Sequence, residues 1–146
     1  MATTRTAHAE WQGDLKAGSG DVALGSGRFE GPYTFVSRFE SGEGGTNPEE
    51  LAGAAIASCY AMFLANVLAQ DGNEAESVRT EAVVELDRVD GAPTVTRIEL
   101  RVVGKVPGID ADAFTAAAEK AKAGCPISKL YTGGSAEIVL DASLEG

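Results

Sequence analysis

Two cysteines, Cys59 and Cys125, are the residues of this 146-residue sequence best suited to redox chemistry. Cys59 lies in S-C-Y, and Cys125 follows 66 positions later in G-C-P. Such a pair could be two unrelated core thiols, a structural disulfide or a redox pair. The first ten residues contain no apolar segment typical of a secretion signal, so we expect a cytoplasmic, reduced chain and no structural disulfide.

A reactive Cys59 would need a positive charge nearby, because only the thiolate is nucleophilic. Cys59 lies far beyond the first turn of the helix expected around it, so the helix dipole helps little and an arginine must supply the charge. Arg38, in Y-T-F-V-S-R-F-E, lies in the densest apolar setting of any candidate, yet composition alone favours the alternative in which it faces solvent from a strand. The candidates are Arg5, Arg28, Arg38, Arg79, Arg88, Arg97 and Arg101.

Other chemistries find little support in the composition. A serine or cysteine hydrolase needs a general base, and the single histidine, His8, is expected to be a surface or edge residue. Two cysteines and one histidine do not supply a tetrahedral zinc site, so no metal is expected. The formal net charge of −10 would repel nucleic acid and anionic membrane surfaces, and we expect neither as a partner.

The first half of the chain predicts three short antiparallel strands followed by a helix. Apolar residues alternate in A-H-A-E-W, in D-V-A-L and in Y-T-F-V-S-R-F-E, and glycine-rich turns separate these stretches. After the flexible S-G-E-G-G at 41–45, Asn47 is a candidate N-cap and Pro48 fits the first helical position. Glu49 and Glu50 then place negative charge at the positive end of the helix dipole.

The predicted helix has no charged residue from Leu51 to Ala69. These nineteen residues could in principle span a bilayer, but acidic flanks without Lys or Arg disfavour a membrane segment. A helix that is apolar all round is expected to be buried on all sides, in the middle of the molecule or of a dimer. Its small residues, Gly53, Ala54, Ala57 and Ser58, would let another backbone approach closely.

The second half predicts a long hairpin turning at Asp90-Gly91, a second helix and a last strand near Leu140. The second helix would be capped by Asp110 and stopped by Gly124, directly before Cys125-Pro126. The expected fold is therefore α+β, with antiparallel sheets, a long buried central helix and a second helix. We expect a single domain over residues 1–146.

Several stretches resemble the OsmC/Ohr family of hydroperoxide-reducing proteins, which comprises osmotically inducible protein C and the organic hydroperoxide resistance proteins. They are T-N-P-E-E-L-A-G-A-A-I-A-S-C-Y-A-M, V-P-G-I-D, K-A-G-C-P-I-S-K, W-Q-G-D and S-R-F-E. The resemblance runs nearly end to end. It implies an OsmC-like fold, an intertwined homodimer and a thiol-dependent peroxidase of oxidative or osmotic stress defence.

The resemblance also implies roles for four residues. Cys59 resembles the peroxidatic cysteine, Cys125 the resolving cysteine and Glu49 the glutamate that orients an essential arginine. The organic-hydroperoxide branch carries that arginine in the first hairpin, where this chain has D-L-K-A-G-S-G without one. Arg38 matches the position used in the OsmC branch, so a strict preference for bulky organic peroxides is not expected.

The family further suggests an external dithiol reductant of the lipoyl type and no bound cofactor. Glutathione and thioredoxin remain open as reductants. The site would be walled by Ile56, Met62, Phe39 and Phe63, which would admit apolar hydroperoxides, although plain core packing is an equal interpretation of Met62 and Phe63.

The spacing of Glu49 and Cys59 raises a geometric problem. Ten residues on one helix correspond to a rise of roughly 15 Å, too far for both to share one arginine. Either the helix begins later than its caps suggest, or Glu49 serves Cys59 of a second chain, and we favour a two-fold homodimer with sites at the interface. Two rival functions stay open, a redox sensor that reacts without turnover and a stress protein that binds apolar ligands.

Overall fold

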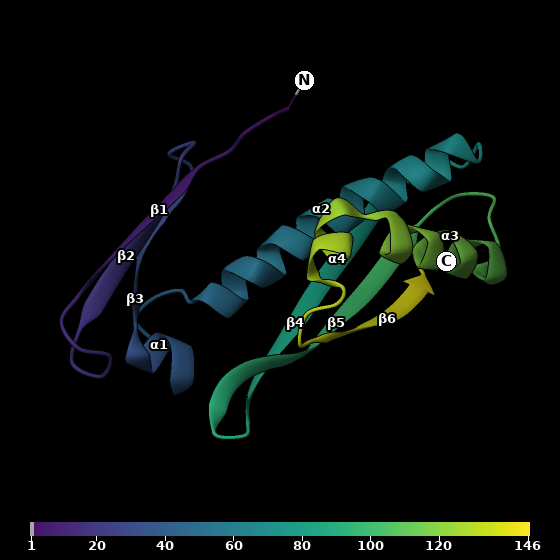
Figure 1. The fold of residues 1–146 in the computed structure, drawn as a ribbon. Coiled ribbons are helices and arrows are strands. Elements are labelled where there is room, and N and C mark those ends of the chain that lie inside the picture. The colour runs from purple at the N-terminus through teal and green to yellow at the C-terminus, as the bar shows by residue number, and fades with distance from the viewer. Residues whose placement is uncertain (1) are drawn as a thin grey trace. The chain divides into compact units, whose positions relative to one another are not determined.

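The computed structural model describes residues 2–146 as six strands and four helices (Figure 1). In chain order they are β1 (Ala7–Gln12), β2 (Ser19–Leu24), β3 (Glu30–Thr34), α1 (Phe35–Phe39), α2 (Pro48–Gln70), β4 (Ser77–Val89), β5 (Ala92–Lys105), α3 (Ala111–Gly124), α4 (Pro126–Tyr131) and β6 (Glu137–Leu144). The mixed α+β class is as predicted. The chain forms two compact units, one up to Leu51 and one from Ala52 to Gly146, and α2 passes from the first into the second. The expectation of a single domain stays a prediction.

The N-terminal unit contains a three-stranded antiparallel sheet in the order β1-β2-β3. Gly20 at the centre of β2 lies between two aromatic rings, and a Cβ there would come within 2.7 Å of Tyr33 and 2.8 Å of Trp11. The Trp11 and Tyr33 ring centroids are 5.3 Å apart, which is a normal spacing for an aromatic pair. The first two predicted strands are confirmed.

The third predicted strand is wrong beyond Thr34, because the chain turns into the short helix α1. The Thr34 hydroxyl accepts a hydrogen bond from the Ser37 amide at 3.1 Å, and the Ser37 hydroxyl accepts one from the Thr34 amide at 2.8 Å. This reciprocal capping box satisfies amides that a helix start otherwise leaves free. The local cap therefore overrides the alternating pattern on which the strand prediction rested.

The start of α2 agrees with its predicted signals. The Asn47 side-chain oxygen accepts a hydrogen bond from the Glu50 amide at 2.7 Å, and Pro48 is the first helical residue. The predicted burial on all sides is wrong for the single chain, because only one stripe of the helix lies in the core. Ile56, Tyr60 and Leu64 have no exposed surface, whereas Met62 on the opposite side is 77% exposed.

By length and composition alone α2 could cross a membrane, since an 18-residue window of it has a mean hydropathy of 1.8. Its buried stripe nevertheless packs in the core of the C-terminal unit, and 33% of that window is buried. The absence of a membrane partner stays a prediction.

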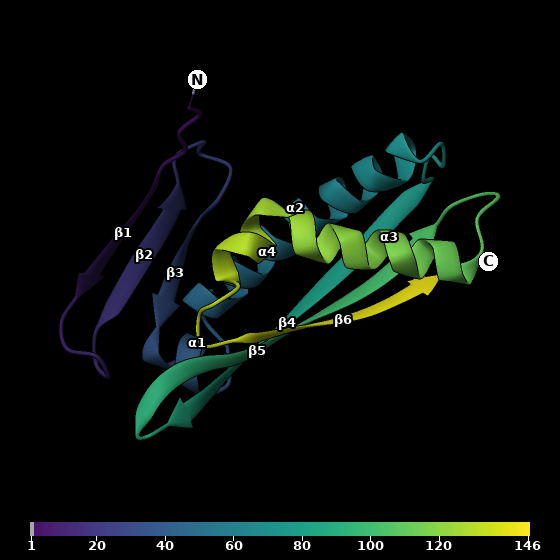
Figure 2. The same ribbon diagram turned by 45° about the vertical axis from the view of Figure 1, so that its right-hand side comes forward.

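The C-terminal unit contains the sheet β4-β5-β6, with the predicted hairpin turning at Asp90-Gly91. The prediction that all sheets are antiparallel is wrong here, because β6 pairs with β5 in parallel. The cause is the crossover through α3 and α4, visible in Figures 1 and 2, which returns the chain to the edge of the sheet in the same direction. The short helix α4 was not predicted.

One face of this sheet carries the core. Ile98, Leu100 and Val102 alternate on β5 with exposed charged side chains, so one face is buried and the other is polar. On the buried face, a Cβ at Gly104 would come within 2.4 Å of the Phe114 ring of α3. Only glycine lets α3 seat this closely on the sheet.

Candidate active site

The two thiols are brought together from distant parts of the C-terminal unit. Cys59 lies in the middle of α2, and Cys125 lies between α3 and α4. Both cysteines are free, and the Cys125 thiol donates a hydrogen bond to the Cys59 sulfur over 3.0 Å. A disulfide needs about 2.05 Å between the sulfurs, so a small movement would join them. This placement favours a redox pair over two unrelated core thiols.

Local structure explains why Cys125 reaches α2. The α3 helix ends at Gly124, as predicted, and the next helix begins at Pro126, so Cys125 is the single residue between them. A Cβ at Gly124 would come within 2.8 Å of the Phe63 ring of α2. The absence of a side chain at Gly124 therefore lets the end of α3 approach α2 at the level of the cysteines.

The surroundings give the two thiols different character. Cys125 has no exposed surface, whereas Cys59 is partly exposed. Burial raises the pKa of the Cys125 thiol, and its hydrogen bond to Cys59 raises it further. Cys125 is therefore held as the protonated donor of the pair, and Cys59 is the more exposed acceptor.

The neighbouring Tyr60 is part of the core. Its hydroxyl donates a hydrogen bond to the Ala118 carbonyl at 2.8 Å. Burial, followed by the charges of Glu119 and Cys125, raises the pKa of Tyr60 above its ordinary value. Tyr60 therefore stays neutral and joins α2 to α3.

Arg38 and Glu49 form an ion pair within the N-terminal unit. The Arg38 Nη2 atom donates to Glu49 Oε1 at 2.8 Å, and Nε lies 3.2 Å from both carboxylate oxygens. The Arg38 side chain is 34% exposed and that of Glu49 is 10% exposed. The Arg38 guanidinium also lies 4.9 Å from the centre of the Phe39 ring. A planar guanidinium held at two points has a fixed orientation.

Hydrogen bonds from the end of the glycine-rich connection hold Arg38 next to Glu49. The buried Ser37 hydroxyl donates to the Thr46 carbonyl at 2.7 Å, and the Asn47 side-chain amide donates to the Ser37 carbonyl at 3.1 Å. These contacts tie α1 to the first turn of α2. The sequence-based alternative of Arg38 facing solvent from a strand is therefore wrong.

A family model described as OsmC-like protein matches residues 41–140. The chain belongs to the OsmC family. The resemblance seen in the sequence is thus confirmed.

Two curated relatives in the OsmC family match almost the whole chain. Peroxiredoxin OsmC of Escherichia coli (strain K12) is 46% identical over 146 residues, which cover 99% of each chain. The protein of the same name from Shigella flexneri gives the same values.

Solved structures of OsmC-like and organic hydroperoxide resistance proteins share the fold. An OsmC like protein from Mycoplasma pneumoniae has a TM-score of 0.76 at 13% identity and covers 100% of both chains. The organic hydroperoxide resistance protein OhrB of Bacillus subtilis has a TM-score of 0.69 at 23% identity, and the alignment covers 96% of this chain and 98% of that one. At these identities the likeness concerns the fold alone.

The unbroken α2 of this OsmC-family chain removes one of the two explanations for the Glu49–Cys59 spacing. The helix runs without interruption from Pro48 to Gln70, so a later start is wrong. Glu49 and Cys59 are separated along it by a rise of roughly 15 Å. Within one chain, the carboxylate that holds Arg38 is therefore remote from the thiol along the helix.

The predicted apolar walls have mixed positions in the OsmC-like fold. Ile56 is fully buried in the core and Phe63 packs against it, so core packing accounts for both. Met62 is not a core residue, because it is 77% exposed in the single chain. Phe39 packs against Phe35, with ring centroids 5.0 Å apart, and is half-buried.

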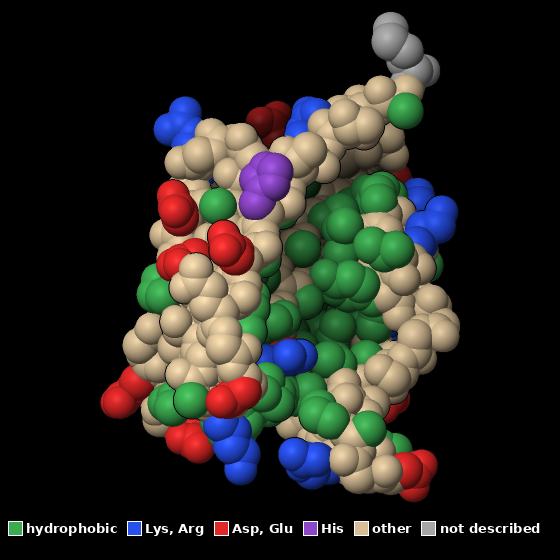
Figure 3. All heavy atoms as spheres, turned by 60° about the vertical axis from the view of Figure 1, so that its left-hand side comes forward, with side chains coloured by type: hydrophobic (Ala, Val, Ile, Leu, Met, Phe, Trp, Pro, Cys, Tyr) green, Lys and Arg blue, Asp and Glu red, His purple; other side chains and the backbone are tan. Residues whose placement is uncertain are grey.

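The single histidine, His8, is exposed on β1, as predicted, and Figure 3 shows acidic side chains below it on the same face. Within residues 2–146, no three His, Cys, Asp or Glu side chains gather as a metal site. What the described residues do assemble is a dithiol and a separately held arginine–glutamate pair.

Proposed function

We propose that this protein is a cysteine-based peroxidase that reduces organic hydroperoxides and H2O2. The observation that carries the proposal is the 3.0 Å contact between two free thiols from α2 and the α3–α4 junction. The name of the Escherichia coli relative, Peroxiredoxin OsmC, supports the activity at 46% identity. The name of the Bacillus subtilis structure, an organic hydroperoxide resistance protein, agrees with the substrate class.

The reaction has three balanced steps. The Cys59 thiol gives up its proton and the thiolate attacks the terminal oxygen of ROOH, so that the O–O bond breaks and Cys59 becomes a sulfenic acid. The leaving oxygen takes up one proton, equal to the one that the thiol released, and departs as the alcohol ROH. Cys125 then attacks the Cys59 sulfur, so that the S–O bond breaks, water leaves and the disulfide forms. An external dithiol returns two electrons and two protons, which restores both thiols.

In this proposal Arg38 holds the Cys59 thiolate and stabilises negative charge on the leaving oxygen, and Glu49 fixes the guanidinium plane. The two-point contact between Arg38 and Glu49 suits this task. The roughly 15 Å rise between Glu49 and Cys59 favours a homodimer in which Arg38 and Glu49 of one subunit serve Cys59 of the other. The exposed side of α2, which includes Met62, offers an apolar surface for such an interface.

We further propose a cytoplasmic role in oxidative or osmotic stress defence, with no bound cofactor. The reductant would be a small dithiol of the lipoyl type. The partial exposure of Cys59 and the full burial of Cys125 suit a slender reductant better than a bulky one.

The proposal is tested by stopped-flow oxidation of the reduced protein with tert-butyl hydroperoxide, cumene hydroperoxide and H2O2. We expect one disulfide per hydroperoxide consumed, counted by mass and by thiol titration. Cys59→Ser should abolish consumption, whereas Cys125→Ser should allow one oxidation to a sulfenic acid without a disulfide.

Steady-state turnover with a dithiol separates an enzyme from a redox sensor, which would oxidise once and stop. Binding of an apolar ligand that survives Cys59→Ser, together with no hydroperoxide consumption by the wild type, would instead identify a binding protein and end the enzymatic proposal.

A further inference from the structure

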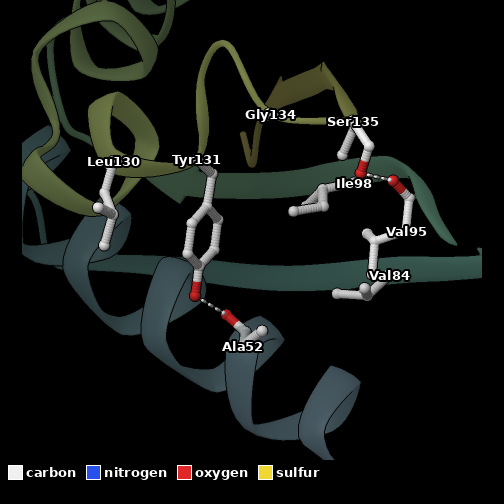
Figure 4. A pocket seen from close by; sticks show the side chains of 9 residues that line it. Ala52, Val84, Val95, Ile98, Leu130, Tyr131, Gly134 and Ser135 are labelled. Atoms are coloured by element: carbon white, nitrogen blue, oxygen red, sulfur yellow. Dashed lines mark hydrogen bonds between the residues drawn. The ribbon is translucent and has the colours of Figure 1, made fainter.

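The short helix α4 is attached at both ends by side-chain hydroxyl groups. Near its start, the Ser128 hydroxyl donates to the Lys122 carbonyl of α3 at 2.7 Å. At its end, the Tyr131 hydroxyl donates to the Ala52 carbonyl of α2 at 3.1 Å, as Figure 4 shows. The helix that follows the resolving cysteine is therefore tied to the helix before it and to the helix that carries Cys59.

These contacts set the register of α4 along α2. Cys125, at the start of α4, meets Cys59, and Tyr131, at its end, meets Ala52. The residue earlier in α4 thus meets the residue later in α2, and the residue later in α4 meets the earlier one. The two helices are therefore antiparallel. Seven residues of α2 rise about 10 Å and six residues after Cys125 rise about 9 Å, so the two contacts match in spacing.

The Ser128 hydroxyl is shielded from competing water, whereas Tyr131 is half-buried and lines the pocket seen in Figure 4. The Ser128 residue is 1% exposed, and its carbonyl in turn accepts a hydrogen bond from the Thr132 hydroxyl at 2.7 Å. Burial raises the pKa of Tyr131, so its hydroxyl stays protonated and remains a donor.

The Lys122 carbonyl has no amide donor four residues on, because that residue is Pro126, so it depends on the Ser128 hydroxyl. The Ala52 carbonyl lies within the continuous helix α2 and keeps its helical hydrogen bond, so the Tyr131 contact adds to that bond.

We propose that Ser128 and Tyr131 are positioning residues of the resolving step, which hold Cys125 in line with the Cys59 sulfur after the sulfenic acid forms. This inference rests on the proposed peroxidase function. The Cys125 sulfur must approach opposite the S–O bond that breaks, and a small displacement of a reacting atom can slow such a step strongly. Neither residue touches the reacting atoms, and each acts through the placement of α4.

Over-oxidation of the Cys59 sulfenic acid competes with disulfide formation, so poor positioning of Cys125 can be measured by its product. If Cys125 arrives late, a second ROOH oxidises the Cys59 sulfenic acid to a sulfinic acid and leaves as ROH. This product adds two oxygen atoms to the Cys59 peptide. Slower resolution therefore appears as more sulfinic acid at the same hydroperoxide concentration.

The test compares Ser128→Ala and Tyr131→Phe with the wild type, using cumene hydroperoxide and rapid quenching. The first step, loss of the Cys59 thiol, should keep its wild-type rate within about twofold. The second step, disulfide formation, should slow about fivefold in each variant, the factor that corresponds to a hydrogen bond of about 1 kcal/mol. The sulfinic acid fraction should rise in parallel.

Ser135→Ala is the matched control. The Ser135 hydroxyl donates to the Val95 carbonyl at 2.7 Å and lies beside the same pocket in Figure 4, but it ties the following loop to β5 and does not hold α4. Both steps should keep their wild-type rates in this variant.

Wild-type resolution in both Ser128→Ala and Tyr131→Phe overturns the inference. Equal slowing of both steps overturns it as well, since that result indicates general loss of structure. A wild-type protein that consumes no hydroperoxide contradicts the proposed function itself and is recognised before any variant is compared.

Discussion

Cys125 is fully buried and donates its hydrogen bond to Cys59, while Cys59 keeps part of its surface exposed. At the scale of residues, this asymmetry suits the different steps that the proposed reaction gives the two thiols. In that proposal the partly exposed acceptor meets the hydroperoxide, and the shielded donor reacts with the sulfenic acid. Burial of Cys125 also protects it from direct oxidation, because access is a requirement for that reaction.

The raised pKa of Cys125 predicts how stability depends on pH. A thiol whose pKa is higher in the folded state stabilises the fold below its unfolded value of about 8.5, and this stabilisation is lost as the pH rises. The free energy of unfolding of the reduced protein should therefore fall as the pH rises through the unfolded-state pKa of about 8.5 and beyond. Urea unfolding with a phosphine reductant measures it, and Cys125→Ser should flatten the fall. An equally steep fall in Cys125→Ser would contradict the assignment.

The two-point contact of Arg38 with Glu49 predicts that lysine cannot replace this arginine. Lysine keeps the charge but not the planar pair of donors, so Arg38→Lys should slow oxidation of Cys59 by about tenfold and Arg38→Ala by about 100-fold. Single-turnover stopped flow with tert-butyl hydroperoxide measures both. Arg88→Lys is the control, since Arg88 is exposed and its guanidinium donates to the Gly91 carbonyl of the hairpin turn. Unchanged rates in the Arg38 variants would remove Arg38 from the site.

At the scale of elements, the junction of α3 and α4 depends on a close approach. A Cβ at Gly124 would come within 2.8 Å of the Phe63 ring, so Gly124→Ala should push the end of α3 away from α2. We expect disulfide formation to slow severalfold while the oxidation of Cys59 is retained, as measured by rapid quenching. Adding Phe63→Leu should restore part of the rate by making room. Failure of this double variant to recover would show that the ring is not the obstacle.

Local signals allowed prediction of those elements whose ends are fixed by neighbouring residues. Asn47 and Pro48 marked the start of α2, and Asp110 and Gly124 marked both ends of α3. The α1 helix was missed because Thr34 and Ser37 cap it within a stretch that alternates like a strand. The pattern T-x-x-S was the available signal.

Features that depend on tertiary packing could not be predicted from the sequence. The parallel direction of β6 follows from the whole crossover through α3 and α4, and the cysteine contact follows from how α3 seats on α2. A separation of 66 residues contains no information on either. The family resemblance indicated the pairing of Cys59 and Cys125, while their spacing alone left three interpretations open.

At the scale of the whole molecule, α2 is the element that both compact units share, and its exposed side carries apolar side chains. Met62 is 77% exposed on this side. Contiguous exposed apolar patches often mark a contact with another chain. In the proposed homodimer, an interface on this side would bring Arg38 of one subunit to Cys59 of the other, despite the length of helix between Glu49 and Cys59.

Subunit mixing tests this directly. Cys59→Ser and Arg38→Ala are each expected to be nearly inactive, but a heterodimer of the two has one complete site if Arg38 acts across the interface. Unfolding and refolding an equal mixture should therefore recover about a quarter of wild-type activity, because half of the random dimers carry one site of two. Separately refolded samples are the control. No recovery in a mixture shown to contain heterodimers would mean that Arg38 acts within its own chain or not at all.

The complete burial of Cys125 has one more consequence, which concerns regeneration. Only the Cys59 side of the disulfide would be open to an incoming reductant, so the transient mixed disulfide should form on Cys59, and Cys125 should be the sulfur released. The reductant would thus react at the same sulfur as the hydroperoxide. The two molecules would therefore compete for access to Cys59.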